Sequence, residues 1–277
     1  MEKIACNLCG SKNTEHLLKT QDILYKTTDQ LFNIVRCINC GLVYLNPRPS
    51  EINHFYPDHY KPYKEEGYTD FIYKIPINPE KNVLDFGCGS GDDLVKLAKQ
   101  HPNWALYGLD CDKRAVDATK KYGFPCFYGS PQEAKYLSNS FDEIYMMNVL
   151  EHLHEPLETL RETARILKKD GSLFILTQNF RSLSRMIFQN KWYGLETPRH
   201  LYHFTPCTLK NMLFEAGFND ITVSYIPSPK YLLQSWAFWK CGGKTSYPKY
   251  IWRLLTIPAI LINFFKLSDM MKVVAKK

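Results

Sequence analysis

The 277-residue sequence predicts an α/β fold with a doubly wound, mostly parallel sheet. The first observation is "NVLDFGCGSGDDLVKLAKQ" (82–100), where an apolar strand, three glycines at alternate positions and a helical apolar pattern follow one another. The second is "WALYGLD", a strand that ends in Asp110 roughly twenty residues later, as in doubly wound nucleotide-binding folds. With 45% hydrophobic residues and a net charge of +7, the chain can bury a core and permits an anionic partner without requiring one.

The glycine-rich turn restricts the class of ligand. A P-loop would continue into Lys-Ser or Lys-Thr, and a dinucleotide fingerprint would place its third glycine at position 92, which is Asp92. Asp92 and Asp93 open the helix, where carboxylates compete with phosphate for the helix N-terminus. A carboxylate at Asp110 suits ribose hydroxyls. These residues predict a nucleoside-like ligand without phosphates.

Two C-x-x-C-G motifs, "CNLCG" and "CINCG", lie near the start of the chain, with "LFNIVRC" between them indicating a strand. Zinc prefers four tetrahedral ligands, and two such knuckles supply four thiolates. The alternative is a redox motif or chance, which would require two matched spacings to coincide. We therefore expect a zinc-ribbon-like module over residues 1–48, with a structural zinc ion on Cys6, Cys9, Cys37 and Cys40.

Four stretches resemble successive motifs of class I S-adenosylmethionine-dependent methyltransferases: "VLDFGCGSGD", "LYGLD", "FDEIYMMNVLEHLHEP" and "ILKKDGSLFILTQN". "CGLVYLNPRPS" and "WYGLETPRHLYHFTPCTLKNMLFEAGF" are similar to the bacterial group in which a four-cysteine knuckle precedes the methyltransferase domain. The resemblance implies a seven-stranded sheet over residues 81–277, a lid at 180–205 and a connector with one short helix at 49–80. Three connector tyrosines are candidates to touch the cofactor: Tyr56, Tyr60 and Tyr63.

The resemblance also implies how S-adenosylmethionine is held. The backbone of the glycine turn would pass the methionine part, Asp85 would hold its ammonium group and Asp110 its ribose. Ser130 stands where the family often has an acid facing adenine, so Gln132 or the backbone is the expected substitute. The predicted cofactor-binding set is Asp85, Phe86, Gly87, Cys88, Gly89, Asp110, Cys111, Ser130 and Asn148.

Methyl transfer to an oxygen of high pKa needs a base, and histidine is the usual one. The candidates are His152, His200 and His203. The alternatives are that His152 braces the fold, and that His200 and His203 pack the lid and cap a helix starting near Thr208. Glu151 with His152 binds a divalent ion in some relatives, but two ligands alone do not make a site. Arg199 suits a substrate phosphate or carboxylate.

"NDITVSYIP" and "MMKVVAKK" are expected, by the resemblance, to close the sheet as an antiparallel pair, with a helical insertion at 227–269 between them. Trp236, Trp239 and Trp252 stand beside basic residues and apolar stretches there. This pattern suits peripheral membrane or lipid contact through 231–267, and equally a homodimer interface or core cover. Pro258 is expected to kink or break its helix.

The sequence therefore predicts a cytoplasmic methyltransferase that acts on an oxygen of a small molecule, such as a sugar or a lipid-like, polyketide-like or carrier-linked metabolite. Two alternatives remain open. No signal-peptide core opens the chain, and the longest apolar run, 254–265, is too short for a membrane span of ~20 residues. One alternative is an RNA methyltransferase with a zinc module, although the basic residues form no dense stripe. The other is a non-catalytic scaffold that binds the cofactor.

Overall fold

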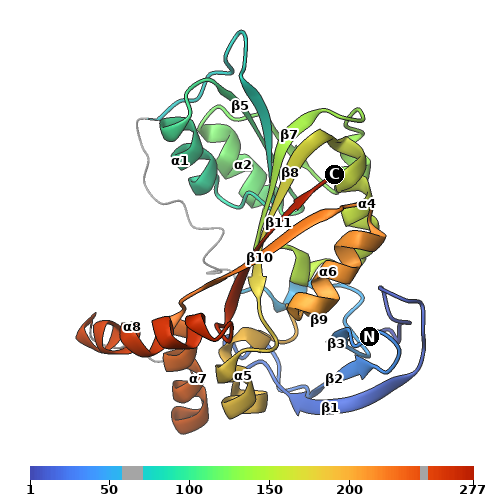
Figure 1. The fold of residues 1–277 in the computed structure, drawn as a ribbon, viewed down its shortest axis with the longest axis vertical. Helices are drawn as coiled ribbons and strands as arrows, with labels where there is room; N and C mark the ends of the chain where they lie inside the picture. Colours follow the sequence, from blue (N-terminus) through green and yellow to red (C-terminus); the bar gives the residue numbers. More distant parts are fainter. Residues whose placement is uncertain (58–70, 244–248) are drawn as a thin grey trace.

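The computed structural model describes residues 1–57, 71–243 and 249–277, which form two sheets (Figure 1). The larger has seven strands in the order β10-β11-β8-β7-β4-β5-β6, and the smaller has four in the order β1-β2-β3-β9. The predicted α/β fold with a doubly wound, mostly parallel seven-stranded sheet is confirmed.

The parallel part of the large sheet is built outward from its central strand β4, which pairs with β5 on one side and β7 on the other. This is the point where the strand order reverses, and doubly wound folds bind ligands there, at the carboxyl ends of the strands. The parallel strands are β4 (Lys81–Phe86), β5 (Trp104–Asp110), β6 (Cys126–Tyr128), β7 (Phe141–Met147) and β8 (Leu167–Gln178).

The two strands predicted to close the sheet do so as an antiparallel pair. β10 (Asp220–Ile226) pairs with β11 (Met270–Lys276), and β11 is antiparallel to β8 as well. Helices cover both faces of the large sheet: α1 and α2 lie on one side, and α4 and α6 lie on the other (Figure 1). Their bounds are α1 (Asp92–Gln100), α2 (Lys113–Lys121), α3 (Pro131–Ala134), α4 (Pro156–Ile166) and α6 (Pro206–Glu215).

The cysteine-rich segment forms the small sheet, from β1 (Thr14–Thr20), β2 (Phe32–Cys37) and β3 (Val43–Leu45). The strand expected at "LFNIVRC" is thus present as β2. The fourth strand, β9 (Tyr202–His203), comes from the expected lid segment and pairs with β3. A single apolar core continues from this sheet into the large one, so the two parts pack as one body.

The rest of the lid segment consists of short helices. These are α5 (Leu183–Phe188), η4 (Gln189–Lys191) and η5 (Tyr193–Leu195). The helix expected near Thr208 is α6, which begins at Pro206 and is capped by Thr205, with Thr208 completing a capping box. Two further 3-10 turns are η1 (Asn53–Phe55) and η3 (Leu150–His152).

The helical insertion consists of α7 (Pro229–Cys241) and α8 (Lys249–Phe264), which lie at the periphery of the molecule (Figure 1). α8 continues through Pro258, so the expectation that this proline would break the helix is wrong, and the kink stays a prediction. Among the described residues, no helix has both the length and the apolar character needed to cross a membrane.

A buried ion pair joins the cysteine-rich segment to the lid segment. Arg199 donates to both carboxylate oxygens of Asp22, at 2.7 and 3.0 Å, and neither side chain is exposed. Burial alone would raise the pKa of Asp22, but the hydrogen bonds and charge of Arg199 hold that pKa below its usual value. Arg199 therefore has a structural role, as the buried partner of Asp22. The expectation that it binds a substrate anion is wrong.

We predict that Asp22→Asn lowers the free energy of unfolding by about 3 to 5 kcal/mol, because it leaves the Arg199 charge buried without its counter-ion. Urea unfolding monitored by circular dichroism measures this change. The matched control is Glu15→Gln, which breaks the exposed Arg36–Glu15 pair and should cost less than about 1 kcal/mol. Equal losses in the two variants would contradict this structural role.

Candidate active site

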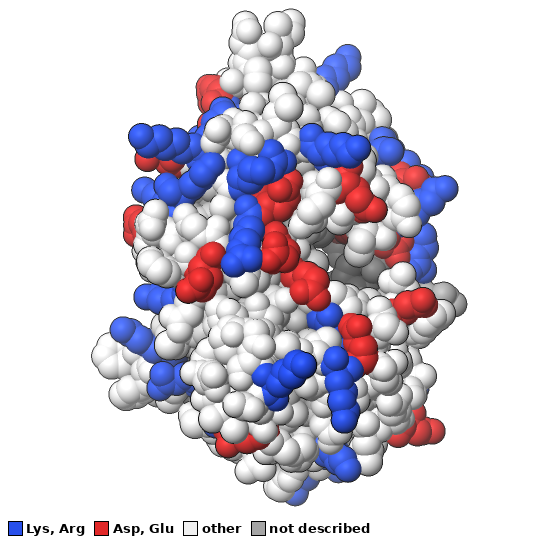
Figure 2. Space-filling view, turned by 90° about the vertical axis from the view of Figure 1, so that its right-hand side faces the viewer, with Lys and Arg blue, Asp and Glu red and all other residues white. Residues whose placement is uncertain are grey.

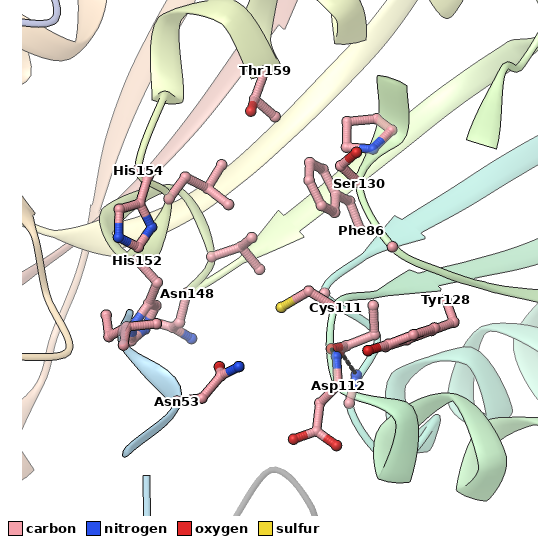
Figure 3. Close-up of a pocket in the computed structure, with 18 of the residues that line it drawn as sticks. Asn53, Phe86, Cys111, Asp112, Tyr128, Ser130, Asn148, His152, His154 and Thr159 are labelled. Carbon is pink, nitrogen blue, oxygen red and sulfur yellow. Dashed lines mark hydrogen bonds between the residues drawn. The ribbon is translucent and has the colours of Figure 1, made fainter. Parts of the chain in front are cut away.

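A cavity of about 620 Å³ opens at the carboxyl ends of β4, β5 and β7. Figure 3 shows its two facing walls: Phe86, Cys111, Asp112, Tyr128 and Ser130 on one side, and Asn148, His152 and His154 on the other. Asn53, in η1, and Tyr56, which follows this turn, also line the cavity. Of the other two connector tyrosines proposed from the sequence, Tyr60 and Tyr63 lie outside the described residues.

The glycine turn after β4 is pressed against the loop that follows β7. Gly87 has a φ of 77°, and a Cβ atom at this position would lie 2.4 Å from Cγ2 of Val149. Any larger residue would therefore clash and would also be strained in this left-handed conformation. Both Gly87 and Gly89 line the cavity, so the turn presents backbone to whatever binds there.

Asp110, at the end of β5, supports this turn and faces the cavity. Its Oδ2 accepts a hydrogen bond from the backbone N–H of Gly89 at 2.9 Å, and its Oδ1 accepts one from Asp112 N–H at 2.8 Å. Burial raises the pKa of Asp110, while these backbone donors oppose the rise. Each oxygen keeps a further lone pair, which fits the two hydroxyls of a ribose.

Cys88 and Asp85 are near the turn but do not line the cavity. The Sγ of Cys88 points into the core, 3.5 Å from Cys126 Sγ, so only its backbone is available. That the backbone of Cys88 passes the ligand stays a prediction. Asp85 is 4% exposed, and its burial, aided by the charges of Asp93 and Asp110, raises its pKa to about 8.

Ser130 lines the cavity, but its hydroxyl group is used in a helix cap. It accepts from Glu133 N–H at 3.2 Å, and Ser130 N–H donates to Glu133 Oε2 at 2.7 Å, which completes a capping box for α3. Glu133 thereby becomes the acid at this edge of the cavity, a role that sequence reasoning missed. The Ser-x-x-Glu spacing was the available signal. Gln132, the expected substitute, does not line the cavity.

Asn148 and His152 form the polar part of the opposite wall. Asn148 has a φ of 57°, which is uncommon for a residue with a side chain and is often found at functional sites. Its Oδ1 accepts a long hydrogen bond of 3.4 Å from Gln178. Figure 3 shows Asn148 and His152 across the cavity from Cys111 and Asp112.

The rings of the three candidate histidines lie next to one another, and of the three only His152 lines the cavity. The rings of His152 and His200 have centroids 4.6 Å apart, and those of His200 and His203 are 6.5 Å apart. His200 and His203 are 2% and 4% exposed and lie outside the cavity lining. Burial lowers the pKa of His152 and of His200 to about 3, and lowers that of His203 well below its usual value, so all three are neutral at pH 7.

Backbone carbonyl groups fix the first two of these rings. His152 Nδ1 lies 3.1 Å from the carbonyl oxygen of Arg199 and 3.0 Å from the hydroxyl of Tyr56. His200 Nδ1 lies 3.0 Å from the carbonyl oxygen of Gly194. The ion pair of Arg199 thus holds the backbone on which the orientation of His152 depends.

The structure brings the four N-terminal cysteines together at a second place, remote from the cavity. Cys6 and Cys40 have sulfur atoms 3.4 Å apart, those of Cys9 and Cys37 are 3.5 Å apart, and all four are free thiols. Thiolates bound to one zinc ion at ~2.3 Å would be about 3.8 Å apart. The four side chains therefore fit a closed tetrahedral site, which leaves no position for a substrate.

Residues 58–223 match the family described as "Methyltransferase domain". The chain belongs to this family. Its large sheet has the class I fold of S-adenosylmethionine-dependent methyltransferases: a structure of such an enzyme from Archaeoglobus fulgidus has a TM-score of 0.51 at 21% identity, covering 71% of this chain and 86% of that one. The prediction that the chain is a methyltransferase is thus confirmed, and the cavity lies where doubly wound folds bind their ligands.

Two curated relatives show what the family can do elsewhere. A "Ubiquinone biosynthesis O-methyltransferase" from Pelagibacter ubique is 28% identical over 151 residues, which are 52% of this chain and 61% of that protein. A "tRNA U34 carboxymethyltransferase" from Desulfotalea psychrophila is 25% identical over 155 residues, 53% of this chain and 48% of that protein. The chain thus spans less than two thirds of the length of either relative.

We predict that S-adenosylmethionine binds more tightly to this methyltransferase domain as the pH rises from 6 to 8. Asp85 is protonated below its raised pKa, and the ammonium group of the ligand favours the ionised form, so binding releases a proton. The dissociation constant should fall by up to about tenfold per pH unit in this range. Calorimetry in buffers of different ionisation enthalpy measures both the affinity and the proton release.

The matched variants are Asp85→Asn, which should bind more weakly and without proton release, and Asp117→Asn on the exposed face of α2, which should behave like the wild type. Proton release that persists in Asp85→Asn would show that another group titrates.

Proposed function

We propose that the protein transfers the methyl group of S-adenosylmethionine to an oxygen atom of a small-molecule acceptor. The observation that carries this proposal is one continuous cavity, lined at one end by the glycine turn and Asp110 and at the other by Asn148 and His152. Its volume of about 620 Å³ lies in the range of small-molecule pockets. The two ends are suited to two different ligands, a nucleoside and an acceptor.

The first end fits the cofactor through residues already described. Asp110 would hold the ribose, the backbone from Gly87 to Gly89 would pass the methionine part, and the Ser130–Glu133 edge would meet the adenine. When bound, the cofactor supplies an activated methyl group with a good leaving group. The chain's contribution is then to position and desolvate the acceptor, and to remove its proton.

The second end would meet the acceptor oxygen with His152, the one candidate histidine that lines the cavity. Its ring is neutral at pH 7, so its free nitrogen can accept a hydrogen bond from the acceptor hydroxyl or bind a cation. His200 and His203 would act behind it, by packing and orientation. The acceptor's position between His152 and the cofactor's methyl group would set the line of the displacement.

An RNA acceptor is the alternative, and the "tRNA U34 carboxymethyltransferase" relative is a reason to test it. The surface in Figure 2 favours a small molecule, because Lys and Arg alternate with Asp and Glu there instead of forming a stripe of one sign. The four-cysteine site, which we propose holds a structural zinc ion, would stabilise the small sheet against the lid segment and need not contact nucleic acid.

The test follows labelled methyl groups from S-adenosylmethionine into a cell extract that is then separated into small molecules, lipids and RNA. We expect label in the small-molecule or lipid fraction, reduced by about 100-fold or more in His152→Gln. The matched control is His101→Gln, which changes a histidine far from the cavity and should leave labelling unchanged. Label in the RNA fraction, or full activity of His152→Gln, would contradict the proposal.

We propose further that α7 and α8 rest on an anionic membrane. Exposed apolar side chains recur along α8 at helical spacing, at Leu254, Ile257, Leu261 and Phe264, each at least 58% exposed. Trp236 and Trp239 are exposed on α7. Residues 227–268 contain six Lys or Arg and no Asp or Glu, a charge that complements anionic lipid. The side chain of Trp252 lies outside the described residues.

We expect the protein to sediment with phosphatidylglycerol vesicles and Ile257→Asp to lose most of this binding, because a carboxylate would enter the apolar face. Leu137→Asp is the matched control, since Leu137 is 79% exposed but lies outside the insertion. A wild-type protein that stays in the supernatant would overturn the proposal. Dimerisation that Ile257→Asp abolishes would then assign this face to a second copy of the chain.

A further inference from the structure

Three side chains converge directly behind the acceptor end of the cavity: Glu151, His152 and His200. Each offers one ligand atom, and these atoms all lie within 4.8 Å of one another. Glu151 and His152 are neighbours in η3, whereas His200 comes from the lid segment. We propose that the three residues bind one divalent transition-metal ion, with an open coordination position that faces the cavity beside His152.

The first argument comes from the carboxylate of Glu151, because only one of its two oxygens has a hydrogen-bond partner among the described residues. Its Oε2 accepts a hydrogen bond from Thr177 Oγ1 at 2.9 Å, but its Oε1 has no hydrogen-bond partner among the residues that the structure describes. The side chain is 0% exposed. A buried acceptor without a partner destabilises the fold, so a ligand at this oxygen would remove that penalty.

The two histidines give the second argument through their hydrogen bonds. A carbonyl oxygen can only accept, so the Nδ1 atoms that face Arg199 O and Gly194 O carry the protons. Their Nε2 atoms then keep the lone pairs. Histidine ligands of metal ions show this arrangement, in which the second ring nitrogen donates to a carbonyl group and fixes the ring.

The donor set indicates the class of ion. Two imidazoles and one carboxylate suit Zn²⁺, Fe²⁺ or Mn²⁺, and three protein ligands leave room for a water molecule or substrate. Ligand atoms on one such ion, with bonds of ~2.1 Å, are about 3 to 4 Å apart, which is close to the spacing of up to 4.8 Å found here. The carboxylate of Glu196, 3.8 Å from His200 Nε2, adds negative charge beside the site.

An arrangement without metal explains less. The contact between His200 Nε2 and Glu196 Oε2, at 3.8 Å, is too long for a hydrogen bond. Such an arrangement would also leave Glu151 Oε1 without a partner among the described residues. A metal ion would bind both Glu151 Oε1 and His200 Nε2. The lone pair on this nitrogen is free because Nδ1 makes the hydrogen bond to the backbone.

The role of the ion toward the acceptor rests on the proposed function. An acceptor hydroxyl bound at the open position would lose its proton more readily, to water in the cavity, because the cation stabilises the oxygen anion. The new O–C bond would form from this oxygen as the C–S bond of the cofactor breaks, and the electron pair of that bond would stay on sulfur. His152 would then be a ligand of the ion and not the proton acceptor.

Binding of Mn²⁺, followed by the loss of the free-ion signal in electron paramagnetic resonance, tests the site on the full chain. Mn²⁺ prefers oxygen and nitrogen donors to thiolates, so the four-cysteine site stays silent. We expect one Mn²⁺ per chain, and at least a tenfold loss of affinity in Glu151→Gln and in His200→Gln. The matched control is His154→Gln: this histidine lies on the same loop, with its Nε2 3.0 Å from the Pro49 carbonyl oxygen, and should keep Mn²⁺ affinity.

Glu151→Gln is nearly isosteric, so it keeps the test valid if His200→Gln does not fold. Unchanged Mn²⁺ binding in a folded Glu151→Gln variant, or no Mn²⁺ binding by the wild type, would overturn the metal site. Calorimetry with S-adenosylhomocysteine on the same samples separates the two proposals. Cofactor binding without Mn²⁺ binding would remove the metal alone, whereas no cofactor binding would remove the proposed function.

Discussion

The cofactor end of the cavity depends on how the Asp110 carboxylate is held. Two backbone N–H groups, from Gly89 and Asp112, fix its two oxygens and tie the glycine turn to the end of β5. The same turn is fixed from the other side by Val149, which leaves no space for a Cβ atom on Gly87. These contacts fix the shape of the turn before a ligand binds, so little conformational entropy of the turn is lost on binding.

The acceptor end depends on a longer chain of contacts. Asp22 holds Arg199, the carbonyl group of Arg199 holds His152, and His152 lines the cavity. The small cysteine-rich sheet therefore bears on the site without contacting a substrate: it supplies Asp22 and pairs β3 with β9 of the lid segment. A zinc ion that stabilises this sheet would, on this account, affect catalysis through the position of one histidine.

Local patterns predicted most of the fold and the cofactor end. The glycine turn, Asp110 and the paired cysteine knuckles could be identified because each depends on residues close in sequence. What failed depends on distant partners. Arg199 is buried because it pairs with Asp22, which is 177 residues away in the sequence. No local pattern shows that His200 and His203 lie behind His152, because they come from a different segment of the chain.

The central claim is that one cavity holds a nucleoside cofactor at Asp110 and directs its sulfur toward His152. A crystal structure of the complex with S-adenosylhomocysteine tests this most directly. The account predicts ribose hydroxyls on the Asp110 carboxylate, the methionine part along Gly87 to Gly89, and the sulfur atom facing His152 across an empty volume. A ribose bound away from Asp110, or a sulfur atom turned from His152, would contradict it.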